Sequence, residues 1–99
     1  MNDREIIRLI DEKAFEKAFN AIVDAYSERL YWHVRRFLNS HDDANDLMQE
    51  IFIKIWKGLA SFRGGSQIFT WAYRIATNEA LNHLRKKGIK VDLDIEIAD

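Results

Sequence analysis

The chain lacks cysteine and proline altogether, and only four of its 99 residues are glycine. Without cysteine, a disulfide framework, a thiol nucleophile and a thiolate metal site are all excluded. The absence of proline favours uninterrupted helices, because a proline in a helix interior removes a hydrogen bond and clashes with the preceding turn. No apolar run reaches the length of a membrane span, and the charged N-terminal residues do not match a secretory signal. We therefore expect a protein without a membrane segment.

The residues that are present are typical of one globular domain with a modest core, since 47% are apolar and 31% are charged. The net charge of −1 hides an uneven distribution. Residues 1–50 carry seven basic and eleven acidic side chains, a balance of −4. Residues 51–88 carry seven basic side chains and one carboxylate, a balance of +6. Such a basic segment either forms a solvated face or binds an anionic partner.

Apolar residues recur at helical spacing along most of the chain, which predicts an all-α fold, a compact helical bundle of about four helices. We expect a short first helix over residues 3–10 and a long second helix over residues 11–38. Asp3 and Asp11 are the expected N-caps, because an aspartate side chain can accept hydrogen bonds from the first-turn amides.

A third helix is expected from Ser40, as its N-cap, to about Lys57, with Gly58 as its terminator. Its apolar face should pack in the core and comprises Ala44, Leu47, Met48, Ile51, Phe52, Ile55, Trp56 and Leu59. Its opposite face comprises Asp46, Gln49, Glu50, Ile53 and Lys57. Ile53 is apolar within a polar rim, so it is either a stray exposed residue or the centre of a partner site.

The last helix follows a loop over residues 61–67, in which two glycines break regular structure and Ser66 offers an N-cap. The polar side chains of this helix share one stripe without a carboxylate: Gln67, Thr70, Arg74, Asn78 and Arg85. Amide, hydroxyl and guanidinium groups suit phosphates and base edges, so the stripe indicates nucleic-acid binding. The alternatives are structural: Trp71 and Tyr73 fit the core, and Phe62 and Asn78 would anchor the loop.

Two blocks of the sequence resemble segments of bacterial extracytoplasmic-function sigma factors, in the same order and with the same gap. Residues 43–52 are similar to the helix with which these factors bind core polymerase. The second block looks like their promoter-melting segment and comprises Phe62-Arg63-Gly64, Ser66, Thr70-Trp71, Tyr73-Arg74-Ile75-Ala76, Asn78, Ala80-Leu81 and Leu84-Arg85. The resemblance covers residues 3–88 and implies a sigma region 2 domain, which is one of the two domains of such a factor.

The resemblance also implies partners and site residues. The first partner is core RNA polymerase, whose clamp helices on the largest subunit would contact Asp46, Gln49, Glu50, Ile53 and Lys57. The second is the non-template strand of the promoter minus-ten element, and the domain would recognise and melt this element. The implied DNA-binding residues are Ser61, Phe62, Arg63, Gly64, Gly65, Ser66, Gln67, Thr70, Arg74, Thr77, Asn78, Arg85, Lys86 and Lys87. In this family the loop and the asparagine equivalent to Asn78 hold a flipped base. An anti-sigma factor and a place in the bacterial cytoplasm are further expectations.

Nothing in the sequence indicates catalysis, a cofactor or a metal. His33, His41 and His83 are not at ligand spacing, and the apolar position of His33 favours a packed side chain. No phosphate-binding glycine motif, nucleophile elbow or carboxylate pair is present. Because there is no ATP site, DNA melting would come from preferential binding of the unpaired strand. The alternative function is a helical protein-interaction module without a DNA-reading role, and a small hydrolase ranks below it.

The last residues, 89–99, alternate between apolar and polar side chains, which is the pattern of a strand. The chain offers no second strand to pair with it. We therefore expect a flexible acidic tail, or a strand that borrows an edge from another molecule. The resemblance implies that this tail begins a linker to a helix-turn-helix domain, which is absent from the sequence.

Overall fold

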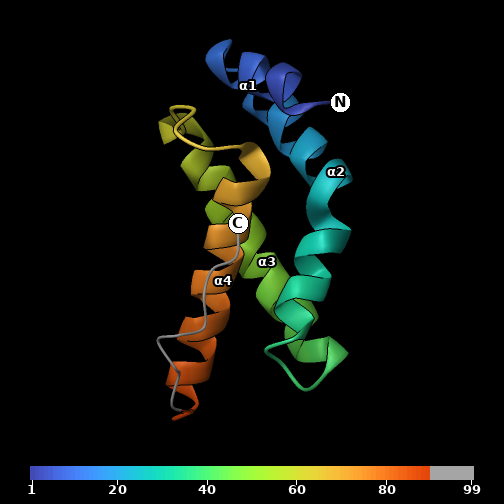
Figure 1. The fold of residues 1–99 in the computed structure, drawn as a ribbon, viewed down its shortest axis with the longest axis vertical. Coiled ribbons are helices and arrows are strands. Elements are labelled where there is room, and N and C mark those ends of the chain that lie inside the picture. Colours follow the sequence, from blue (N-terminus) through green and yellow to red (C-terminus); the bar gives the residue numbers. More distant parts are fainter. Residues whose placement is uncertain (90–99) are drawn as a thin grey trace.

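The computed structural model describes residues 1–89, which form four α-helices and a short 3-10 turn (Figure 1). The elements are α1 (Asp3–Asp11), α2 (Phe15–Arg35), α3 (His41–Gly58), η1 (Leu59–Ser61) and α4 (Ile68–Lys86). The all-α prediction is confirmed. Within this described part, no helix is both long and apolar enough to cross a bilayer. The hypothesis about the tail concerns residues that, apart from Ile89, lie outside the described ones.

The helices pack as a bundle in which α2, α3 and α4 contact one another in every pairing, while α1 packs on α2. Figure 1 shows α4 and α2 at the front, α3 behind them and α1 across one end, close to the loop that precedes α4. The core is aliphatic, and its largest fully buried apolar side chains are Ile6, Ile22, Leu30, Val34, Ile51, Ile55, Leu59 and Ile68. Burial of each contributes about 1.5–3 kcal/mol, and Ile68 among them holds the first turn of α4 against the core.

Trp56 departs from its predicted place in the core, because 46% of its side chain is exposed. Its ring meets Phe19 of α2 edge-on, with 5.6 Å between the ring centroids. The apolar spacing of α3 was read correctly for the other positions, but Trp56 lies at the rim of the contact with α2. A residue at such a rim contributes one ring face to packing and leaves the other to solvent.

The predicted N-cap of α3 is confirmed, while the predicted caps of α1 and α2 and the predicted end of α2 are not. The Ser40 hydroxyl accepts a hydrogen bond from the Asp43 amide at 3.1 Å, which confirms the predicted cap of α3. The cap of α1 is Asn2 and not Asp3, since Asn2 Oδ1 accepts from the Glu5 amide. Two further predictions are wrong: α2 ends at Arg35 instead of residue 38, and its N-cap is Ala14 instead of Asp11.

The reason that Asp11 is not a cap lies in the turn between α1 and α2. The amides of Lys13 and Ala14 donate to the carbonyls of Ile10 and Leu9, and Lys13 has a φ of 62°. These paired bonds and the left-handed residue make a Schellman motif, which places Asp11 inside α1. Gly88 ends α4 in the same way, with a φ of 77°.

Gly58, the expected terminator, is the last residue of α3, but its φ of −83° shows that it does not end the helix in the left-handed conformation common for glycine. The chain continues directly into η1. A Cβ atom at position 58 would lie 2.8 Å from Cζ2 of Trp71. The glycine is therefore explained by the close approach of Trp71, on α4, to the end of α3.

Candidate nucleic-acid interface

The polar stripe predicted for the last helix lies on the surface of α4, opposite the core. Its exposed members are Gln67, Arg74, Asn78 and Arg85, and Thr70 is half-buried. The inner face of the helix holds Ile68, Ala72, Ala76 and Ala80, all fully buried. The small alanines let α4 approach its neighbours closely, and this fixes the outward direction of the stripe.

The first turn of α4 is held by Asp3, which comes from the opposite end of the chain. Asp3 Oδ2 accepts a hydrogen bond from the Ile68 amide at 3.0 Å, and Asp3 Oδ1 accepts one from the Tyr26 hydroxyl at 2.6 Å. Burial, together with the hydrogen bond to the Asp3 carboxylate, raises the pKa of Tyr26 to about 12. The predicted cap by Ser66 is wrong, because the Ser66 hydroxyl donates to the Gln67 carbonyl instead.

The loop before α4 carries one buried ring and one exposed cation. Phe62 is only 8% exposed and packs edge-on against Trp71, with 5.2 Å between the ring centroids. Arg63 is exposed and donates to the Ala60 carbonyl at 3.0 Å, while Gly64 has a φ of 76°. Phe62 is therefore an anchor of the loop. It also lines, with Arg63 and Gly64, a cavity of about 620 Å³ that opens toward α1.

Asn78 lines a different hollow, of about 360 Å³, between α3 and α4. Ten helical residues separate it from Ile68, a distance of about 15 Å along the axis. The loop residues Phe62, Arg63 and Gly64 are not among those that line this hollow, and the shared base pocket that the resemblance implied stays a prediction. In this hollow Glu79 is 14% exposed and pairs with Lys54 at 3.0 Å. The carboxylate on this side of α4 is therefore neutralised.

Thr77 is not on the surface, although the sequence placed it among the DNA-binding residues. Its side chain is fully buried, and its hydroxyl donates to the Tyr73 carbonyl at 2.9 Å. It lies 2.6 Å from Nε2 of His33, which is packed as predicted and 6% exposed. Because the hydroxyl proton is used by Tyr73, the imidazole must carry its proton on Nε2 and donate it to Thr77. Thr77 thus joins α4 to α2.

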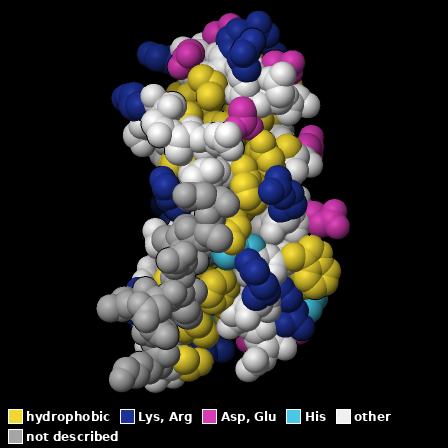
Figure 2. Space-filling model, in the orientation of Figure 1, with side chains coloured by type: hydrophobic (Ala, Val, Ile, Leu, Met, Phe, Trp, Pro, Cys, Tyr) yellow, Lys and Arg dark blue, Asp and Glu magenta, His cyan; other side chains and the backbone are white. Residues whose placement is uncertain are grey.

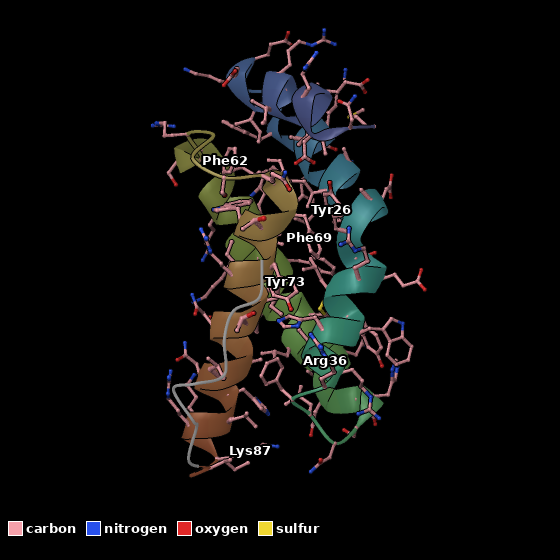
Figure 3. All side chains as sticks on the ribbon, in the orientation of Figure 1. Tyr26, Arg36, Phe62, Phe69, Tyr73 and Lys87 are labelled. Atoms are coloured by element: carbon pink, nitrogen blue, oxygen red, sulfur yellow. The ribbon has the colours of Figure 1, made fainter. Side chains whose placement is uncertain are left out.

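The other imidazole nitrogen of His33 accepts a hydrogen bond from the exposed Arg36 at 2.7 Å. The same guanidinium donates to the Tyr73 hydroxyl at 3.2 Å, and Tyr73 stacks on the His33 ring with 3.8 Å between centroids. Figure 3 shows Tyr26, Phe69 and Tyr73 between α4 and α2, with Arg36 beside them. Sequence reasoning missed the contribution of α2, although a seven-residue spacing of Arg29 and Arg36 indicates a shared helix face.

The basic residues at the end of α4 are all exposed. Arg85 donates to the Asn82 side chain at 3.1 Å, and Lys87 forms an exposed ion pair with Asp43 at 3.5 Å. An exposed pair of this kind contributes little to stability and separates readily. These cations continue the basic stripe to the end of α4. They also interact favourably with the negative, C-terminal end of the helix dipole.

The predicted partner face of α3 is exposed at every position: Asp46, Gln49, Glu50, Ile53 and Lys57. Ile53 is 46% exposed, and Trp56, three residues later, is equally exposed. The apolar centre of this face is therefore larger than the sequence predicted. An apolar centre within a charged rim has the composition of a protein interface.

Three comparisons with known proteins agree with one another. The family model described as sigma-70 region 2 matches residues 22–89. The RNA polymerase sigma-H factor of Pseudomonas aeruginosa is 35% identical over 98 residues, which are 98% of this chain and 50% of that protein. The ECF RNA polymerase sigma-E factor of Escherichia coli K12 is 40% identical over 88 residues, which are 89% of this chain and 45% of that protein. The chain thus spans about half the length of these relatives.

One similar solved structure is the NMR structure of an engineered region 2 of sigmaE in complex with GTAAAA. It shares 36% identity with this chain and a TM-score of 0.76, and the match covers 89% of this chain and 90% of that one. The shared fold therefore extends over nearly the whole of both chains.

Proposed function

Because the chain belongs to the sigma-70 region 2 family, we propose that it binds core RNA polymerase and recognises the promoter minus-ten element. The observation that carries the proposal is the exposed, carboxylate-free stripe of α4, in a chain 36% identical to a domain solved in complex with GTAAAA. We assign the chain to the extracytoplasmic-function group and place it in the bacterial cytoplasm, where it has no catalytic role of its own.

On the DNA side, the stripe from Gln67 to Arg85 faces the non-template strand. Asn78 offers one donor and one acceptor to a base edge at the hollow between α3 and α4. Its neighbour Glu79 would repel phosphates, but the ion pair with Lys54 offsets this charge. Melting follows from preferential binding of the unpaired strand, since unstacking costs a few kcal/mol and the new contacts offset it.

On the polymerase side, Ile53 and Trp56 form the apolar centre of the α3 face, and the charged residues around them form its rim. We propose that this face contacts the clamp helices of the largest subunit. An anti-sigma factor would inhibit most directly by covering the same apolar centre. The two proposed surfaces lie on different helices, so polymerase and DNA can be bound together.

The proposal is tested with Asn78→Ala, measured by fluorescence anisotropy on a minus-ten oligonucleotide and a scrambled one, with polymerase core present. Loss of a base-edge contact should cost roughly 1–3 kcal/mol on the preferred sequence and much less on the scrambled one. Lys86→Ala, in contrast, should weaken both alike and flatten the salt dependence by about 0.7 in log–log slope. Asn20→Ala, an exposed asparagine on α2, is the matched control.

If Asn78→Ala weakened the binding of both oligonucleotides equally and also lowered the melting temperature, Asn78 would have a role in stabilising the fold and not in reading a base. The reading of the base would then move to the loop, with Arg63 and Gln67 as the next candidates. Binding to polymerase without any preference for the minus-ten sequence would favour the alternative, a helical protein-interaction module.

A further inference from the structure

Arg29 of α2 and Arg36, the C-cap residue of α2, are held in fixed positions beside α4. The guanidinium carbon of Arg29 lies 3.9 Å from the centroid of the Phe69 ring and 6.0 Å from that of Tyr26. Arg36 is held by the hydrogen bonds to His33 and Tyr73. Stacking on a ring and bonding to an imidazole both restrict a side chain that is otherwise flexible. Each guanidinium is therefore ordered before any ligand arrives.

Both arginines are exposed, and within residues 1–89 neither is paired with a carboxylate. Seven residues separate them, which is two helical turns, so they share a face of α2 and lie about 10 Å apart along its axis. Figure 2 shows Lys and Arg side chains beside an apolar strip that runs down this side of the molecule. The half-buried rings of Tyr26, Phe69 and Tyr73 pack in series between α2 and α4 (Figure 3).

We propose that Arg29 and Arg36 bind phosphates of single-stranded nucleic acid, so that a strand held by α4 continues across these rings onto α2. The proposal rests on the proposed function, because α4 must hold the same strand. Charge complementarity favours this occupant: two cations that pair with no carboxylate of residues 1–89 flank rings whose free edges suit bases. A guanidinium stacked on a ring still presents its N–H fork to a phosphate. Thr70, the half-buried member of the stripe, is by helical spacing the one nearest to Phe69 and Tyr73, so the stripe borders this surface.

Arg29 is the residue to change, because its side-chain contacts within residues 1–89 are with aromatic rings, whereas Arg36 also supports His33. Fluorescence anisotropy would compare a minus-ten hexamer with the same hexamer extended by six nucleotides on its 5′ or its 3′ side. Arg29→Gln should weaken one extended oligonucleotide roughly fivefold and lower its salt slope by about 0.7, while the hexamer changes less than twofold. Arg29→Lys should keep the salt slope, and Lys17→Gln, on an exposed residue in the first turns of α2, is the matched control.

Three outcomes would overturn the proposal: unchanged binding of both extended oligonucleotides, equal weakening of hexamer and extended strands, or loss of the salt slope in Arg29→Lys as well. Tight binding of polyglutamate that requires Arg29, with no effect on the oligonucleotides, would also overturn it and assign the surface to an acidic protein. Failure of the proposed function gives a different result, since wild-type protein would then bind the hexamer and its scrambled form equally. Melting temperatures of the variants show whether each is folded.

Discussion

The buried imidazole of His33 should make the domain lose stability as the pH falls from about 6.5 to about 4. Burial, and then the charge of Arg36, lower the pKa of His33 from 6.5 to about 4. In this window the unfolded chain binds a proton that the folded chain does not. The contribution of His33 to the free energy of unfolding is therefore fully present above about pH 6.5. It decreases as the pH falls and is lost below about pH 4.

The size of the effect follows from the same shift. A change from 6.5 to about 4 corresponds to roughly 3 kcal/mol at 1.36 kcal/mol per unit. We expect about 2–3 kcal/mol, because the exposed Arg36 can turn away from a protonated ring and reduce the repulsion. Since 1 kcal/mol shifts the melting temperature of such a domain by about 4–8 °C, acidification should lower it by roughly 10–20 °C.

The assay is urea unfolding followed by circular dichroism, at several pH values through this window. Carboxylates titrate in the same range, so wild type is compared with His33→Gln, which keeps a donor toward Thr77 but does not titrate. The difference between the two proteins isolates the contribution of His33. Parallel profiles for wild type and His33→Gln would refute the reasoning.

Three further variants test the contacts that orient α4 and the face of α3. Asp3→Ala removes the carboxylate that bonds the Ile68 amide, and should destabilise the domain by about 2–3 kcal/mol in urea unfolding; a loss below about 0.5 kcal/mol would contradict this role. Gly58→Ala should cost about 1 kcal/mol instead of stabilising α3, because its Cβ meets Trp71; a rise in melting temperature would show that the ring moves freely. Ile53→Arg should leave the circular dichroism spectrum unchanged yet weaken binding to polymerase core by about 2 kcal/mol or more, with Ile53→Leu as control; equal affinities in a pull-down titration would remove Ile53 from the interface.

The elements of the fold could be predicted because their signals are local. Apolar spacing indicated each helix, and the hydroxyl of Ser40 reaches an amide only three residues away. The stripe of α4 could be predicted for the same reason, since residues three and four apart share a face.

Three of the errors fall where a distant residue decides the outcome. Ser66 is a good cap by composition, but the amide of Ile68 is bonded by Asp3. Thr77 lies at the edge of the polar stripe on a helical wheel, and only the position of α2 shows that this edge is covered. Trp56 is the reverse case, because the contact with α2 ends before it covers the ring. A wheel gives the angle between two side chains of one helix but not the angle at which a second helix arrives.

The carboxylate of Asp3 and the amide of Ile68 are 65 positions apart in sequence, which has a consequence for how the chain is made. During synthesis Asp3 is available early, but the group that it bonds is formed only after more than half of the chain has followed. The first turn of α4, and with it the loop that carries Arg63, can therefore be set only after α1 has docked. A fusion placed directly before Asn2, or the loss of the first few residues, would therefore affect a contact 65 positions further along the sequence. For this chain an affinity tag at the N-terminus is not a neutral choice.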